Sequence, residues 1–186
     1  ALRPPRPRDG PQGTFGTVLV AAGSSHYWGA PLLCGLGAYR AGAGLVALAV
    51  PRAVRPVAAG RLPEATYPPV PAAEDLDEAS AAMLLEDAER YDALLVGPGL
   101  GHAPGFVEAL LVQQERLPPL VVDADGLNTL AALDDWPARL PRNTILTPHP
   151  GEMARLMGSS LAELKERDRV DLAREHALAW HHVVLL

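Results

Sequence analysis

Four short polar segments carry residue types that could bind a small molecule, and each directly follows an apolar stretch. They are residues 23–30 (GSSHYWGA), 97–101 (GPGLG), 123–128 (DADGLN) and 147–152 (TPHPGE). Glycines allow a backbone to approach a ligand closely, carboxylates are ligands for Mg²⁺, and a histidine can contact a substrate or exchange a proton with it. The four segments together indicate a small-molecule site that could hold charged groups.

The first two segments are glycine-rich loops, and each has two interpretations. Residues 23–30 lead into a predicted helix whose free N–H groups could hold an anion, and Tyr27 and Trp28 could stack on a flat ligand. An ordinary strand–helix turn has the same pattern. Residues 97–101 are either a phosphate-type loop or a tight turn. They are not the dinucleotide fingerprint, because its third glycine would replace His102.

The other two segments contain acidic residues and a histidine. Asp125 is expected to cap the helix that follows it, whereas Asp123 is a candidate for function, such as holding Mg²⁺ through water. His149 stands between Pro148 and Pro150, which fix its backbone and remove neighbouring N–H donors. A rigidly held imidazole at a strand end favours contact with a ligand over a purely structural role.

Apolar strands and amphipathic helices alternate along the chain and would position these segments. Strands are predicted at 17–22, 45–50, 92–96, 120–122, 144–147 and 183–186. Helices are predicted at 30–41, 52–60, 74–90, 104–115, 126–133, 151–157 and 160–181. This order predicts an α/β fold with a mostly parallel sheet and helices on both faces. Ligands bind beyond the carboxyl ends of such strands, so the four segments should share one edge of the sheet.

Length and composition limit the possible functions. The 186 residues are 48% hydrophobic and have a net charge of −6, which indicates one globular domain over 14–186, behind an extended Pro/Arg-rich arm at 1–13. The acidic balance excludes nucleic acid as the main partner, and no apolar run approaches about 20 residues, so no membrane span is expected. The single Cys34 favours a reducing compartment, the cytoplasm. The chain ends inside an apolar, apparently interior strand at 183–186, which predicts a fragment.

The sequence resembles the NAD(P)H-hydrate dehydratase family, which has the ribokinase-like fold. The stretches that carry the resemblance are 23–33 (GSSHYWGAPLL), 39–51 (YRAGAGLVALAVP), 62–67 (LPEATY), 92–101 (DALLVGPGLG), 121–128 (VVDADGLN) and 147–156 (TPHPGEMARL). Each is a weak signal alone, but six in one order are specific. The resemblance identifies residues 14–186 as the N-terminal two-thirds of the family domain.

The resemblance implies repair of a damaged nicotinamide cofactor. ADP or ATP, with Mg²⁺, would phosphorylate the ring hydroxyl of the S-epimer of hydrated NADH or NADPH, and loss of phosphate would restore NAD(P)H. Family contacts carried over to this chain imply substrate binding by Ala30, Gly99 and His149, with Glu152 and Asp123 as neighbours. A homo-oligomer is also implied.

The family pattern continues beyond Leu186 with groups that this chain does not contain. In the family, a Lys-Gly pair helps to hold the nucleotide, and a Gly-Gly-Thr-Gly-Asp turn forms an anion hole and supplies the base. The resemblance therefore implies no catalytic residue, nucleotide motif or metal ligand within this chain. Two alternatives remain: a vitamin-precursor or sugar kinase of the same fold, and a non-catalytic paralogue that binds nucleotide and a partner subunit.

Overall fold

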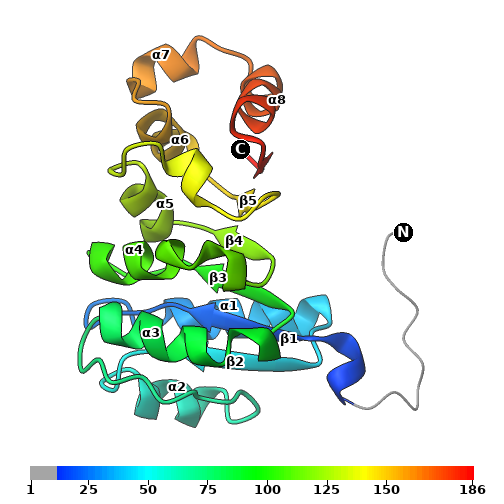
Figure 1. The fold of residues 1–186 in the computed structure, drawn as a ribbon, viewed down its shortest axis with the longest axis vertical. Helices are drawn as coiled ribbons and strands as arrows, with labels where there is room; N and C mark the ends of the chain where they lie inside the picture. Colours follow the sequence, from blue (N-terminus) through cyan, green and yellow to red (C-terminus); the bar gives the residue numbers. More distant parts are fainter. Residues whose placement is uncertain (1–11) are drawn as a thin grey trace.

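A computed structural model describes residues 12–186 as a parallel α/β fold (Figure 1). Its sheet has six strands in the order β2-β1-β3-β4-β5-β6, and every neighbouring pair is parallel. The strands are β1 Thr17–Ala21, β2 Leu45–Ala49, β3 Ala93–Val96, β4 Leu120–Val122, β5 Ile145–Leu146 and β6 Val183–Val184. The α/β prediction is confirmed, and strand boundaries agree with the predicted ones to within two residues.

Eight α-helices connect or flank these strands in the described part of the chain. They are α1 Ala30–Ala41, α2 Arg55–Arg61, α3 Glu78–Glu86, α4 Pro104–Val112, α5 Asp125–Leu130, α6 Pro150–Leu156, α7 Leu161–Lys165 and α8 Arg169–Trp180. Short 3-10 turns occur at Gln12–Phe15, Ala88–Arg90, Gln114–Arg116 and Trp136–Arg139. The predicted arm at 1–13 lies almost wholly outside the described residues.

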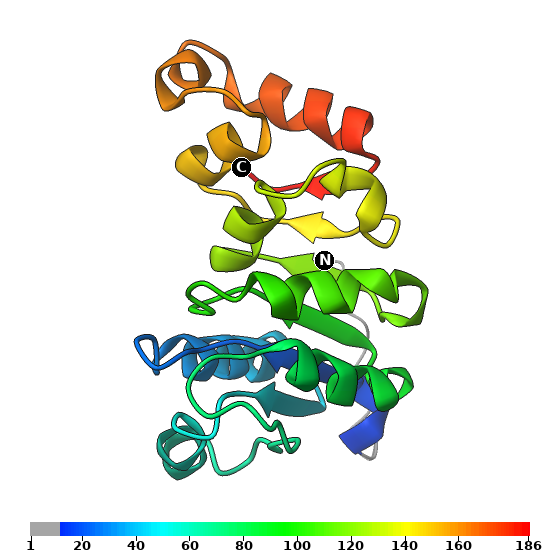
Figure 2. The ribbon, with the colours of Figure 1, turned by 60° about the vertical axis from the view of Figure 1, so that its left-hand side comes forward.

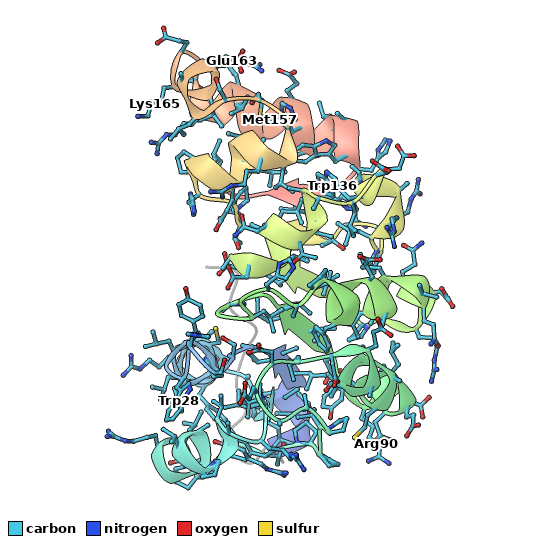
Figure 3. All side chains as sticks on the ribbon, turned by 90° about the vertical axis from the view of Figure 1, so that its left-hand side faces the viewer. Trp28, Arg90, Trp136, Met157, Glu163 and Lys165 are labelled. Carbon is cyan, nitrogen blue, oxygen red and sulfur yellow. The ribbon has the colours of Figure 1, made fainter. Side chains whose placement is uncertain are left out.

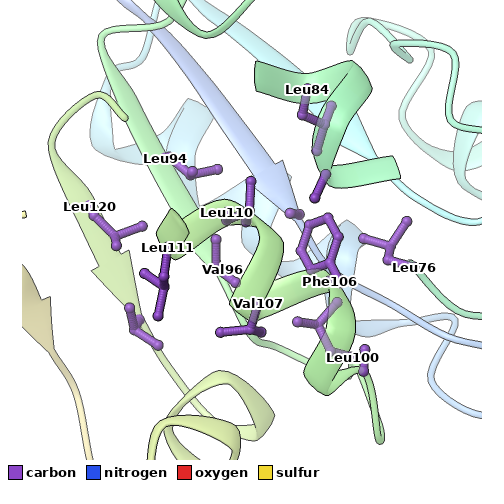
Figure 4. Close-up of a cluster of buried hydrophobic side chains, with 14 of the residues drawn as sticks. Leu76, Leu84, Leu94, Val96, Leu100, Phe106, Val107, Leu110, Leu111 and Leu120 are labelled. Carbon is purple, nitrogen blue, oxygen red and sulfur yellow. The ribbon is translucent and has the colours of Figure 1, made fainter. Parts of the chain in front are cut away.

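Two apolar layers lie on opposite faces of the sheet. Helices α1 and α2 pack on one face, against a cluster that includes Val20 and Leu48. Helices α3, α4 and α5 pack on the other face, against Leu19 and Val96. Figure 4 shows Phe106 of α4 pointing into this second cluster. Strands buried on both faces are continuous apolar runs, which explains why the sequence predicted them well.

The last part of the chain forms a smaller cluster at one end of the molecule. Figures 1 and 2 show α6, α7 and α8 beside β5 and β6, whereas α2 lies at the opposite end. Met153, Leu164 and Leu172 of these helices pack together. Among the described residues β6 is the last strand of the sheet and pairs with β5, and the interior position predicted for residues 183–186 stays a prediction.

The prediction of a single helix at 160–181 is wrong, because the structure divides this range into α7 and α8. The capping box of Ser160 and Glu163 starts α7 as expected. The carboxylate of Asp168 then accepts hydrogen bonds from the N–H groups of Val170 and Asp171, so that a new helix begins. This break sets the start of α8 beside α7 and contributes to a cavity described below.

The sheet order places a topological switch point between β1 and β3. The chain leaves β1 for β2 on one side and returns to β3 on the other side. The loops after β1 and β3 therefore leave the sheet toward opposite faces, and the space between them is where open α/β sheets bind ligands. None of the described helices is long and apolar enough to cross a membrane.

Candidate functional site

The loops after β1, β3, β4 and β5 lie at one edge of the sheet and contain all four predicted segments. In Figure 3, Trp28 of the first loop and Lys165 near the fourth lie toward the same side of the molecule, and Arg90 lies toward the other. The N–H of Gly23 donates a hydrogen bond of 3.0 Å to the carbonyl of Pro98. The first two loops are thus joined directly.

The glycines of the 97–101 loop allow close contact with the loops on either side. Gly97 has φ +131°, and a Cβ atom there would lie 1.8 Å from the carbonyl oxygen of Asp123. Gly99 has φ +68°, and its Cβ would lie 2.7 Å from Tyr27 Cβ and 2.8 Å from Ala30 Cβ. The N–H of Leu100 donates to the carbonyl of Gly97, which makes a tight turn. The structure therefore brings predicted site residues Gly99 and Ala30 together.

Asp125 does not cap the following helix as predicted. The residue that precedes α5 is Ala124, which makes no side-chain cap, and Asp125 is the first helical residue. Its carboxylate Oδ2 instead accepts a 2.9 Å hydrogen bond from the N–H of Gly101. Ala124 has φ 50° and ψ −120°, a conformation that suits glycine. This hydrogen bond joins the 97–101 loop to the segment that follows β4.

Asp123 faces a different set of neighbours. Its Oδ1 accepts a 2.9 Å hydrogen bond from the hydroxyl of Thr147, which joins the segments after β4 and β5. Burial and, to a smaller extent, the negative charge of Asp123 together raise the pKa of the Cys34 thiol on α1 to about 11. Cys34 is therefore a neutral, half-buried thiol that packs against the core, as its place in a small-residue helix suggested.

His149 is an exposed side chain that also caps α6. Its Nδ1 accepts a 3.0 Å hydrogen bond from the N–H of Gly151, so the neutral ring carries its proton on Nε2. That nitrogen lies 3.1 Å from Oε1 of the buried Glu152, and Oε2 of Glu152 accepts from the N–H of His149. Predicted site residues His149 and Glu152 are thus joined as a capping box.

Two residues near the first loop were missed by the sequence analysis. The carboxylate of Asp75 accepts hydrogen bonds from the N–H and the hydroxyl of Ser25, at 3.1 and 3.2 Å. These bonds join the first loop to a residue that is 50 positions away in the sequence. Ser24 is buried, and its hydroxyl has no hydrogen-bond partner in the described residues. A Cβ at Gly101 would lie 3.5 Å from this oxygen. An unsatisfied hydroxyl between the β1 and β3 loops is a polar group with which a ligand or water could form a hydrogen bond.

A family model described as NAD(P)H-hydrate dehydratase matches residues 18–186. The bifunctional NAD(P)H-hydrate repair enzyme Nnr of Moorella thermoacetica is 40% identical over 190 residues, which cover 98% of this chain and 35% of the relative. The ADP-dependent (S)-NAD(P)H-hydrate dehydratase of Bacillus subtilis is 36% identical over 186 residues, which cover 100% of this chain and 63% of the relative. The chain thus spans between a third and two thirds of these relatives.

Solved structures show the same fold. The crystal structure of the Bacillus subtilis ADP/ATP-dependent NAD(P)H-hydrate dehydratase, co-crystallised with ATP and Mg²⁺, has a TM-score of 0.79 at 34% identity and covers 99% of this chain and 62% of that one. A ribokinase-like superfamily protein from Enterococcus faecalis has a TM-score of 0.77 at 21% identity and covers 98% and 61%. The second likeness concerns the fold alone.

Proposed function

Since this chain belongs to the NAD(P)H-hydrate dehydratase family, we propose that it acts in nicotinamide cofactor repair, the ADP- or ATP-dependent dehydration of the S-epimer of hydrated NADH or NADPH. The fold is the ribokinase-like α/β fold. The observation that carries the proposal is the meeting of the β1 and β3 loops at the switch point, where Gly99 packs on Ala30.

The chemistry that we propose takes place in two steps. A phosphoryl group moves from ADP to the ring hydroxyl of the hydrated nicotinamide, which leaves AMP and a phosphate ester. The bond between the ring carbon and the ester oxygen then breaks, with help from the lone pair of the ring nitrogen, and phosphate leaves. Loss of a proton from the neighbouring ring carbon restores the double bond. Phosphate leaves more readily than hydroxide, so the nucleotide is consumed to improve the leaving group. Such a transfer depends on positioning and on electrostatic stabilisation.

The residues of this chain would mainly bind and orient the substrate. Ala30 and Gly99 would border the nicotinamide ring, and the exposed imidazole of His149 would contact it from the β5 side. Glu152 would act as a positioning residue, because its carboxylate holds both His149 N and Nε2. Asp123 would lie nearby, with one carboxylate oxygen already bound to Thr147.

Mg²⁺ is part of this proposal as the ion that accompanies the nucleotide. No group of three or more histidine, cysteine, aspartate or glutamate side chains among residues 12–186 could hold a metal ion by itself. Mg²⁺ that is bound with a nucleotide keeps waters and phosphate oxygens as ligands and needs only one or two protein carboxylates. Asp123 is the carboxylate that would serve. When bound, the ion would neutralise charge on the phosphates.

The function is tested with hydrated NADPH, ADP and Mg²⁺. We expect the chain to bind the hydrated cofactor in calorimetry. Once a C-terminal segment with the family's Gly-Gly-Thr-Gly-Asp turn is supplied, we expect reduced nicotinamide, followed by its absorbance, to return in an ADP-dependent way. Binding without return would assign this chain to the non-catalytic alternative. Absence of both, together with phosphorylation of a sugar or vitamin precursor, would favour the kinase alternative and contradict the proposal. The molar mass of the same preparation, measured in solution, tests the proposed homo-oligomer. Fractionation of the source cells tests the proposed cytoplasmic location.

Replacing His149 separates its contact with substrate from its role as a helix cap. His149→Ala should lower the affinity for hydrated NADPH about tenfold, and loss of the cap should lower the free energy of unfolding by about 1 kcal/mol. His149→Asn keeps a side chain that caps helices well. It should therefore restore stability but not affinity, as measured by urea unfolding and calorimetry.

A matched control is Ser160→Ala, which removes the cap of α7 in the same type of capping box. This variant should lose similar stability and keep its affinity for the hydrated cofactor. If His149→Asn binds hydrated NADPH as tightly as the unchanged chain does, His149 is a structural residue and leaves the proposed site.

A further inference from the structure

A cavity of about 460 Å³ lies next to His149, between α6, α7 and the start of α8. It has the size of a small-molecule pocket. Its lining contains four fixed cations, one imidazole and no carboxylate. The charged or titratable lining residues are His149, Arg155, Lys165, Arg167 and Arg169. A protein with a net charge of −6 thus places 4 of its 16 basic residues around one cavity.

The acidic side chains near this cavity are directed elsewhere. Glu152 is buried and bound to His149. Glu163 accepts from the N–H and hydroxyl of Ser160 at the start of α7. Asp168 is occupied as the cap of α8. Among the described residues, no aspartate or glutamate belongs to the lining of the cavity.

Two of the four cationic side chains, those of Arg155 and Arg167, bind other side chains of this chain. The other two are available to bind a ligand. Arg167 forms an ion pair with Glu175 of α8. The guanidinium of Arg155 donates a 2.9 Å hydrogen bond to Asn128, which holds it in place. The side chains of Lys165 and Arg169 make no hydrogen bond or ion pair with the described residues. A cleft lined by one sign of charge concentrates ions of the opposite sign.

The cavity is connected to the glycine loop by a chain of polar contacts. Asp125 binds the N–H of Gly101 through one carboxylate oxygen and is 3.5 Å from the amide nitrogen of Asn128 through the other. Asn128 in turn accepts from Arg155. His149 lies on the cavity lining and also belongs to the proposed substrate site. His149 thus borders both the proposed substrate site and the cavity.

We propose that this cavity binds the phosphate groups of a nucleotide, with Lys165 and Arg169 as the main contacts. Guanidinium groups match phosphate in geometry, and an ammonium group adds a compact charge. The proposal rests on the proposed function for the identity of the nucleotide, which is either the phosphoryl donor or the dinucleotide substrate. Both present the same pyrophosphate chemistry to the cavity.

The experiment compares Lys165→Gln/Arg169→Gln with the unchanged chain in calorimetry. The probes are inorganic pyrophosphate, ADP, hydrated NADH, hydrated NADPH and adenosine. We expect the affinity for pyrophosphate to fall about tenfold or more, with a weaker dependence on salt, and the affinity for adenosine to stay unchanged. The matched control is Arg142→Gln, an exposed arginine in the turn before β5, at the opposite edge of the sheet. It should bind every probe normally.

The pattern over the probes identifies the source of the phosphate. A fall for ADP alone assigns the cavity to the phosphoryl donor, and a fall for both hydrated dinucleotides assigns it to the substrate. If the double variant binds every phosphate probe as the unchanged chain does, the proposal is overturned, even where hydrated NADPH still binds and is repaired. If pyrophosphate binding depends on the two cations but hydrated NADPH does not bind at all, the cavity proposal stands and the proposed function fails.

Discussion

An alanine in place of Gly97 is expected to lower the free energy of unfolding by about 4 kcal/mol or more, an unusually large effect for one methyl group. The new Cβ would lie 1.8 Å from the carbonyl oxygen of Asp123 and 2.9 Å from the backbone nitrogen of Gly126. These two groups are hydrogen-bonded to each other at the end of β4. Neither is the end of a flexible side chain, so β3 and β4 would have to separate at their carboxyl ends.

Urea unfolding of Gly97→Ala measures this cost, and Gly158→Ala is the matched control. Gly158 also has a positive φ, +65°, but a Cβ there meets no atom within 4 Å. It should therefore show only the strain of the left-handed conformation, about 1–2 kcal/mol. If the two variants lose the same stability, the strands are not as close at Gly97 as the structure places them.

A valine in place of Gly99 is expected to abolish binding of hydrated NADPH and to lower the free energy of unfolding by about 2–4 kcal/mol. From the sequence alone, glycine at this position indicates a close approach of the backbone to a ligand, and a valine would fill the space that the ligand needs. The structure gives a different cause, because Tyr27 and Ala30 already occupy the space at 2.7 and 2.8 Å. The valine would push the β1 loop away from the β3 loop and so open the switch point.

The control is Gly158→Val, at nearly the same φ but in open space. Calorimetry at a temperature where both variants are folded should show normal binding for Gly158→Val and a loss of more than about tenfold for Gly99→Val. Normal affinity in a folded Gly99→Val variant would remove the 97–101 loop from the site.

Most of the sheet could be predicted from the sequence, and the last helices could not. Thr17–Ala21 and Leu45–Ala49 are continuous apolar runs between glycines or prolines, and burial on both faces requires such runs. Residues 160–181 have good helix formers throughout, so local propensity favours one helix. The break occurs because the carboxylate of Asp168 accepts hydrogen bonds from two backbone N–H groups as the cap of α8. Aspartate is favoured at caps over helix interiors, so Asp168 was a signal for the break that the sequence analysis missed.

The sequence by itself determined the α/β class, the positions of the four polar segments that follow the strands, and the family, because these depend on residue order and on the pattern of neighbouring residues. Only the tertiary structure decided what the individual side chains contact. Asp125 binds Gly101 from 24 residues away, Asp75 holds Ser25 from 50 residues away, and cations from α6 to α8 meet in one cavity. Such contacts follow from the strand order and the crossover paths, which bring distant residues together at one edge of the sheet.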